Sequence, residues 1–150
     1  GGQWKTVAVK TSNTAVSHKI TGLKASTTYK FRVRAFINDE SGKIYSVYNV
    51  TLTEATAPSA VANFRTVISA RTAVRFNWNR NASADGYIVE MKINNKWTTI
   101  ANFDSNKSIA AAKTGLTPGT EYQARIRAYK TINGKVIYGA YSYIDTATAV

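Results

Sequence analysis

The stretch Thr114-Gly-Leu-Thr-Pro-Gly-Thr-Glu-Tyr-Gln-Ala-Arg-Ile-Arg-Ala-Tyr129 has an earlier counterpart, Thr21-Gly-Leu-Lys-Ala-Ser-Thr-Thr-Tyr-Lys-Phe-Arg-Val-Arg-Ala-Phe36. The two stretches lie 93 positions apart. Residues outside them match at the same offset, among them Trp4 with Trp97, Tyr45 with Tyr138, and Tyr48 with Tyr141. Matches at one fixed offset indicate a duplication, and a period of this size suits a small domain repeated whole.

Apolar and polar residues alternate along both copies with the period of a β-strand. In the second copy one set is Tyr122, Ala124, Ile126 and Ala128, and the other is Gln123, Arg125, Arg127 and Tyr129. Successive side chains of a strand point to opposite faces, so we expect the first set in a core and the second outside. Residues 108–113 have some helix propensity, but their counterpart 14–19 is β-branched, which favours a strand in both copies. Regularly spaced short strands predict an all-β sandwich.

The second copy resembles a fibronectin type III domain over its whole length. The residues that carry the resemblance are Trp78, Leu116, Pro118, Tyr122 and Ala128. In the family's order, strand A would be 58–64, B 74–78, C 84–90, C′ 96–100, F 125–129 and G 138–148. The resemblance implies an immunoglobulin-like β-sandwich in which the Tyr122 hydroxyl ties back to upstream backbone. The core implied by it contains Trp78, Tyr87, Leu116, Tyr122 and Ile126, with Tyr29 and Val33 in the first copy.

The first copy is expected to be incomplete. Residues 58–150 cover a complete domain, whereas residues 1–57 cover only its later part, strands C′, E, F and G. Without strands A to C, Val33 and one strand edge would be uncovered, and an exposed edge tends to pair with another strand. A second identical chain has no spare A–B–C set to lend. We therefore expect a separate segment, such as an upstream part of the same protein, to complete the first sandwich.

Composition limits the function classes. The chain has no cysteine and one histidine, His18, which predicts neither a disulfide nor a metal site. Its eight acidic residues form no recurrent pair, and no phosphate-binding glycine loop is present, so we expect neither catalysis nor a cofactor. The net charge of +12 comes from scattered basic residues, which makes nucleic acid an unattractive partner. No apolar run is long enough to span a membrane.

The outward face of the C–C′–F–G sheet is the candidate ligand-binding surface. It is expected to carry Trp97, Arg125, Arg127, Tyr129 and Tyr141. An aromatic ring beside guanidinium groups can stack on sugars or bind an anionic cell-wall polymer. It can also be structural, with Trp97 packed over the stem of Arg127 as a cation–π pair, the interpretation we favour.

The stretch Ala128-Tyr-Lys-Thr-Ile-Asn-Gly-Lys-Val-Ile-Tyr-Gly-Ala-Tyr-Ser142 is similar to modules of secreted or wall-associated proteins of anaerobic gut and rumen Firmicutes. The resemblance implies a non-catalytic, extracellular bacterial module that acts as a spacer or adhesive element beside flanking domains. Two alternatives remain open. One is a carbohydrate-binding accessory module that uses the outward face, and the other is a strand-complemented subunit of an extracellular assembly.

Overall fold

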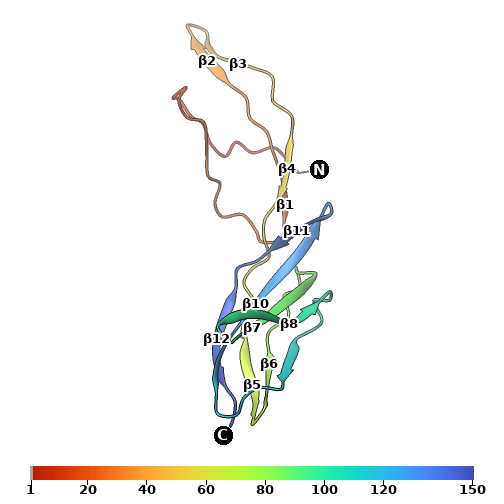
Figure 1. Cartoon of the computed structure of the whole chain (residues 1–150). Coiled ribbons are helices and arrows are strands. Elements are labelled where there is room, and N and C mark those ends of the chain that lie inside the picture. The colour runs from red at the N-terminus through yellow and green to blue at the C-terminus, as the bar shows by residue number, and fades with distance from the viewer. Residues whose placement is uncertain (1) are drawn as a thin grey trace.

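The computed structural model describes residues 2–150, and all regular structure among them is β. The strands in the first part of the chain are β1 (Thr28–Phe31), β2 (Phe36–Asp39), β3 (Gly42–Tyr45) and β4 (Leu52–Ala55). Those in the rest are β5 (Arg65–Ala70), β6 (Ala73–Asn77), β7 (Gly86–Ile93), β8 (Lys96–Phe103), β9 (Ala110–Thr114), β10 (Glu121–Ile132), β11 (Lys135–Tyr138) and β12 (Ser142–Ala147). Figure 1 shows an elongated molecule with the first four strands at one end.

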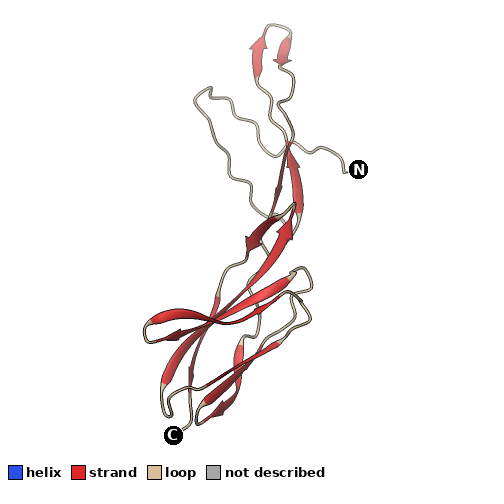
Figure 2. Ribbon diagram, turned by 45° about the vertical axis from the view of Figure 1, so that its right-hand side comes forward, coloured by secondary structure: helices blue, strands red, loops and turns tan. Residues whose placement is uncertain are grey.

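Residues 58–150 form a two-sheet sandwich, which confirms the predicted fold class. One sheet has the order β5-β6-β9, and the other has the order β11-β10-β7-β8 with β12 also paired to β10. The pairings are antiparallel (Figure 2). The alternation in the sequence explains the layers, because β6 and β7 each turn every second side chain into the space between the sheets. The core filled by these side chains includes Val74, Phe76, Trp78, Tyr87, Val89, Met91, Leu116 and Ile126.

One strand is displaced from its expected position. Residues 58–64 were expected to form the opening strand, but the strand that pairs with β6 is β5, Arg65–Ala70. The preceding segment still packs against the sandwich, since Pro58 and Val61 are buried. The Asn79 N–H also donates to the Ala62 carbonyl at 2.9 Å. This segment therefore covers an end of the core without joining the sheet.

The turn before β10 in the second copy has a counterpart before β1 in the first copy, and both turns are closed by a tyrosine and a threonine. The Tyr122 hydroxyl accepts a hydrogen bond from the Thr117 N–H at 3.1 Å, and the Tyr29 hydroxyl accepts one from the Lys24 N–H at 2.9 Å. A threonine hydroxyl closes each turn: Thr148 Oγ1 donates to the Thr117 carbonyl at 2.6 Å, and Thr56 Oγ1 donates to the Lys24 carbonyl at 2.5 Å. The tyrosine hydrogen bond thus repeats at the offset of 93, whereas the two threonines are 92 positions apart.

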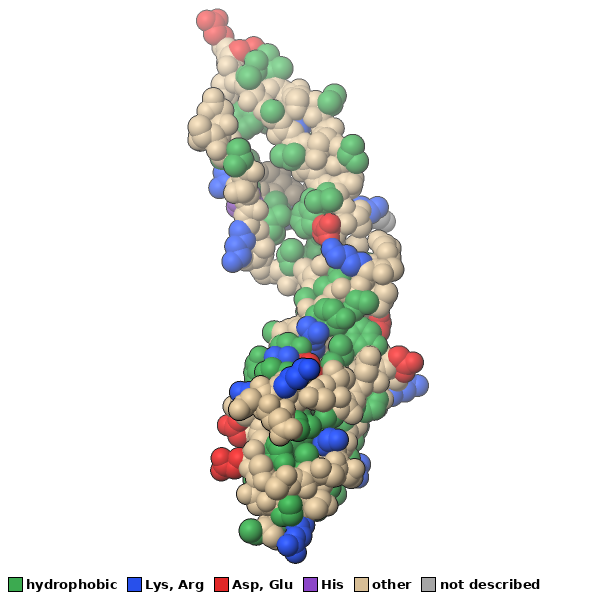
Figure 3. All heavy atoms as spheres, in the orientation of Figure 1, with side chains coloured by type: hydrophobic (Ala, Val, Ile, Leu, Met, Phe, Trp, Pro, Cys, Tyr) green, Lys and Arg blue, Asp and Glu red, His purple; other side chains and the backbone are tan. Residues whose placement is uncertain are grey.

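The first copy lacks a core. None of the described residues before Pro58 is buried, and Tyr29 is only half-buried. Its strands form two separate pairs, β1 with β4 and β2 with β3. In Figure 3 an opening separates the N-terminal segment from the strand-bearing part. The described part of the first copy thus forms the hydrogen bonds of the turn, but it has no second sheet to pack against β1 and β4.

Three expectations for the first copy are wrong. Val33 was expected in the core but is 66% exposed, because no second sheet lies over it. Residues 3–7, the counterpart of strand C′, and residues 14–19 were expected to be strands, but they form no regular structure. Their counterparts β8 and β9 pair with β7 and β6, and the first copy contains no equivalent of either partner among its described residues. A strand needs a paired neighbour to be stable.

Candidate functional site

The outward face of the β11-β10-β7-β8 sheet carries an alternating stack of aromatic rings and guanidinium groups, here called the second ladder. The Arg125 guanidinium lies 4.2 Å from the ring centre of Trp97 and 4.1 Å from that of Tyr141. The Arg127 guanidinium lies 3.9 Å from the ring centre of Tyr138 and 4.8 Å from that of Tyr141. Each guanidinium is therefore held between two rings, and the ladder runs Trp97–Arg125–Tyr141–Arg127–Tyr138.

Strand geometry places these side chains together. Arg125 and Arg127 are two residues apart on β10, so both point to the same outward face. Trp97 lies on β8, and its side chain reaches Arg125 across the intervening strand β7. Tyr138 ends β11 and Tyr141 immediately precedes β12, on the other side of β10. Three strands and the residue that leads into a fourth are thus tied together across one face, each contact contributing about 0.5–1 kcal/mol where exposed.

Glu90 on β7 anchors the second ladder. Its carboxylate accepts a hydrogen bond from Arg125 Nε at 2.7 Å, and the two residues face each other in the β7–β10 register. Burial acts to raise the pKa of Glu90. Hydrogen bonds from Arg125 and Tyr141 and the positive charges of Arg125 and Arg127 outweigh burial, and the pKa is held below its ordinary value. Burial and the hydrogen bond to Glu90 raise the pKa of Tyr141.

The same ladder occurs in the first copy. The Arg32 guanidinium lies 4.0 Å from the ring centre of Trp4 and 3.8 Å from that of Tyr48. The Arg34 guanidinium lies 3.7 Å from the Tyr45 ring and 4.7 Å from the Tyr48 ring. This first ladder therefore repeats the second one residue for residue at the offset of 93. It forms although the first copy has no core.

The structure brings four of the five candidate face residues into the second ladder and places the fifth, Tyr129, beside its last ring, with 6.3 Å between the ring centres of Tyr129 and Tyr138. Trp97, Arg125, Arg127 and Tyr141 belong to the ladder, but Trp97 stacks on Arg125 and not on Arg127 as expected. Trp97 lies opposite Lys92 on β7, and Arg125 lies opposite Glu90, two residues from Lys92, whereas Arg127 lies opposite Ile88, four residues from it, so Arg125 is the nearer arginine. Tyr129 is half-buried and its hydroxyl donates to the Phe103 carbonyl at 3.1 Å. Its ring lies over Gly86 and takes no part in the arginine stack.

Sequence reasoning missed Glu90 and Tyr138 as members of this face. Tyr138 carried a signal, because it matches Tyr45 at the same offset as the tryptophans and arginines. Alternation along 87–91 places Glu90 on the outward side of its strand, but its position opposite Arg125 depends on the strand register, which the sequence alone does not fix.

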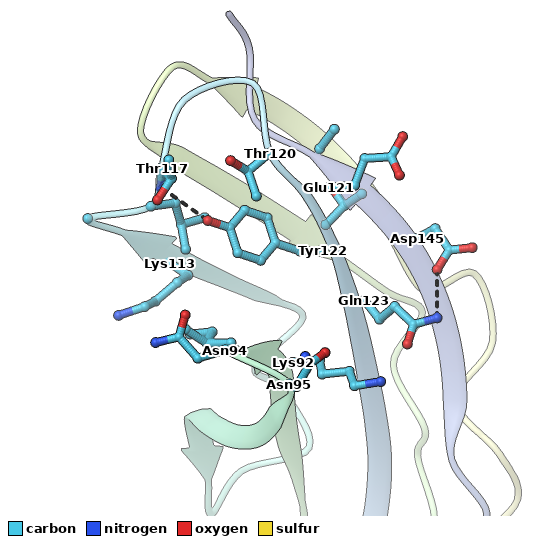
Figure 4. Close-up of a pocket in the computed structure, with 15 residues that line it drawn as sticks. Lys92, Asn94, Asn95, Lys113, Thr117, Thr120, Glu121, Tyr122, Gln123 and Asp145 are labelled. Carbon is cyan, nitrogen blue, oxygen red and sulfur yellow. Dashed lines mark hydrogen bonds between the residues drawn. The ribbon is translucent and has the colours of Figure 1, made fainter.

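A broad polar hollow of about 1160 Å³ lies at the far end of the second sandwich. It is bounded by the β7–β8 turn, with Asn94 and Asn95, and by the turn that leads into β10 (Figure 4). Lys92 and Lys113 face it together with Glu121 and Asp145, and Gln123 Nε2 donates to Asp145 Oδ1 at 3.2 Å. The two ion pairs of the described chain, Arg125–Glu90 and Lys130–Asp85, both lie elsewhere. The hollow thus offers two lysines and two carboxylates, with no ion pair between them.

The described residues hold no group of three or more histidine, cysteine, aspartate or glutamate side chains that could bind a metal ion. The described residues include no helix that is long and apolar enough to cross a membrane. The site with defined geometry is therefore the pair of ladders. These have the chemistry of a structural or binding surface.

Comparison with known proteins places the chain. The model of the fibronectin type III domain matches residues 56–139, more than half of the chain. Exoglucanase B of Cellulomonas fimi is 29% identical over an alignment of 123 residues. The alignment covers 77% of this chain and 11% of the exoglucanase. The chain thus corresponds to about a tenth of that relative.

Solved structures share the fold. A variant of the fibronectin type III protein FN3tt is 17% identical, with a TM-score of 0.51 over 62% of this chain and 98% of that one. The FN1–FN3 domains of chicken CNTN1 are 20% identical, with a TM-score of 0.53 over 89% of this chain and 46% of that one. Family match, sandwich topology and tyrosine-anchored turn agree. The chain belongs to the fibronectin type III family.

Proposed function

We propose that the chain is a non-catalytic spacer and protein-interaction module of a larger extracellular bacterial protein. The observation that carries the proposal is the composition of the outward face: the guanidinium groups of Arg125 and Arg127 stack on the rings of Trp97, Tyr141 and Tyr138. These contacts brace the sheet, and each ring already stacks on at least one guanidinium group, which leaves less ring surface for a sugar. An elongated, internally braced module suits the task of holding neighbouring domains apart (Figure 1).

The setting is proposed from the relatives. The similarity to Exoglucanase B covers a small part of that protein, as expected for an accessory module beside a catalytic domain. We propose that this chain likewise accompanies other domains of a secreted or cell-surface protein, one that acts on or attaches to polysaccharide. Residues 128–142 resemble modules of gut and rumen Firmicutes, and on this resemblance we propose that the chain comes from a bacterium of that group.

Affinity electrophoresis of the chain in gels that contain cellulose, xylan, starch or mucin tests the spacer role. We expect no retardation by any of the four, because every ring of the second ladder already stacks on a guanidinium group. Retardation by one of them, reversed by the soluble oligosaccharide, would replace the spacer role with glycan binding. Retardation by mucin that disappears between 50 and 200 mM salt would indicate binding of an anionic polymer through the basic charge.

A carbohydrate-binding role is the second candidate, and Tyr143 favours it. Its side chain is 63% exposed, and its ring centre lies 6.1 Å from that of Trp97 and 5.9 Å from that of Tyr141. Tyr143 thus presents an uncovered ring beside the second ladder. If a glycan binds there, Tyr143→Ala abolishes the retardation. Val67→Ala, a change at a 42% exposed residue of the other sheet, leaves it unchanged.

A further inference from the structure

The outward face of the β5-β6-β9 sheet carries charge of one sign. Residues 58–84 and 105–120 contain the three strands of this sheet, and they include six basic residues and no acidic one. The rest of residues 58–150, which forms the sheet of the second ladder, has six basic and five acidic residues. The acidic residues of the sandwich therefore all belong to one sheet and the loops next to it, and the β5-β6-β9 sheet has none.

The arginines of the two sheets also differ in what they contact. Arg125 and Arg127 each lie between two rings, and Arg125 pairs with Glu90 as well. Arg71 and Arg75 are exposed, and neither forms an ion pair or a ring contact with a described residue. The β5-β6-β9 sheet thus presents guanidinium groups that have not been taken up by the protein's own carboxylates and rings.

Strand register places these arginines in a row. Arg75 points outward, because its two neighbours on β6 are buried in the core. Arg65 on β5 lies opposite Asn77, two residues along β6 from Arg75, so it is on the same face about 7 Å further along the strand direction. Arg65 Nη1 donates to the Asn63 carbonyl at 3.1 Å, which leaves its other donors for a ligand. Arg71 lies at the opposite end, in the turn between β5 and β6, so the order along the face is Arg71, Arg75, Arg65.

The side chains around this row are small or aliphatic. Arg75 lies between Ile68 on β5 and Ala112 on β9. The one aromatic residue of the three strands, Phe76, is fully buried. The bases of a single-stranded nucleic acid stack on aromatic side chains, and this face offers none. It also has no helix or protruding two-stranded ribbon of the kind that enters the major groove of duplex DNA.

We propose that this face binds a flexible phosphodiester polymer without bases, of the poly(glycerol phosphate) type found in bacterial cell walls, through Arg71, Arg75 and Arg65. The guanidinium group forms two parallel hydrogen bonds to a phosphate, and a chain with one charge per unit can engage arginines spread along a flat sheet. Charge complementarity selects a polyanion, and the lack of rings selects a polymer that needs no stacking. The choice of a cell-wall polymer rests on the proposed extracellular bacterial function, to which wall attachment adds a second role.

Calorimetric titration of the full chain with poly(glycerol phosphate) at about 50 mM salt tests the proposal. We expect the double variant R65Q/R75Q to raise Kd at least about tenfold and to reduce the slope of log Kd against log salt by about two. The matched control K96Q/K135Q removes the same charge from exposed positions of the other sheet and should change Kd less than about twofold. Equal weakening in both double variants would mean that binding follows net charge, and it would overturn the assignment to this face.

A second variant tests the same row without removing an arginine. Ala112→Glu places a carboxylate at an exposed position opposite Arg75, so we expect it to weaken binding at least about tenfold as well. Urea unfolding of each variant reports that the sandwich is intact. Unchanged binding by folded Ala112→Glu would contradict the role of Arg75.

Two further polyanions test the choice of ligand. Polygalacturonate has carboxylates on sugar rings, and a single-stranded oligonucleotide has phosphates and bases. We expect each to bind at least about fivefold more weakly at equal charge concentration, because its rings find no aromatic side chain on this face. Equal or tighter binding of either one would assign the face to that class instead. Failure of all three to bind would overturn this inference and leave the spacer role standing, whereas retardation by a neutral glycan would overturn the spacer role alone.

Discussion

At the scale of single residues, Gly86 shows how tightly the second sandwich is packed at the base of the ladder face. A Cβ atom added at Gly86 would lie 1.9 Å from the Phe103 carbonyl oxygen and 2.7 Å from Tyr129 Oη. Backbone cannot yield as a flexible side chain can. Gly86→Ala is therefore expected to lower the free energy of unfolding by about 2–3 kcal/mol, measured by urea denaturation. Gly2→Ala, which meets no atom within 4 Å, is the matched control and should have no effect.

The charge of Glu90 gives a pH-dependent prediction. Its pKa is held below the ordinary value of 4.5 in the folded chain, so its contribution to stability is fully present above that value and is lost as pH falls through the folded pKa. Glu90→Gln should therefore lower stability at pH 7 and reduce the loss of stability between neutral and strongly acidic pH. Thermal unfolding between pH 2 and 7 measures both effects. Parallel curves for the two proteins would show that Arg125 does not stabilise the Glu90 carboxylate.

At the scale of elements, the tyrosine-anchored turn connects β9 to β10. Tyr122→Phe removes the acceptor for the Thr117 N–H while keeping the ring, so we expect a loss of about 1 kcal/mol in the urea unfolding of the second sandwich. Tyr29→Phe removes the equivalent bond to Lys24 and serves as the matched control. Because the first copy has no core, that change should leave the main unfolding transition unchanged. An equal loss in both variants would mean that the two copies unfold together.

The sequence predicted the elements of the second copy well and those of the first copy poorly. Alternation in 122–128 identified β10, and the Leu-Thr-Pro-Gly-Thr-Glu-Tyr motif identified the turn, because both signals are local. The same alternation misplaced Val33, since burial depends on a second layer and not on the strand's own pattern. The sequence predicted only part of the second ladder. The offset of 93 showed that the tryptophan and the arginines recur in both copies, but the contacts of Arg125 with Trp97 and with Glu90 depend on the strand register.

At the scale of the whole molecule, stability is concentrated in one half of the chain. Every buried residue lies at or after Pro58, and the two sheets there enclose a continuous aromatic cluster that includes Phe76, Trp78 and Tyr87. The earlier part carries many exposed apolar side chains, with Val16 at 94% and Val47 at 90%. Burial of such a side chain contributes about 1.5–3 kcal/mol, and the first copy gains almost none of it. The two halves should therefore respond differently to a protease.

Limited proteolysis with trypsin tests this difference directly. Lys10, Lys19 and Lys24 lie in an exposed segment without strands, so the enzyme should cut the first copy within minutes. Because Lys43 is the last lysine or arginine before Arg65, the resistant fragment should be residues 44–150. Cleavage of the transiently open state follows the local opening free energy, which burial raises only in the second copy. Mass spectrometry of the digest identifies the fragment. Equal survival of both halves would show that the first copy closes on itself.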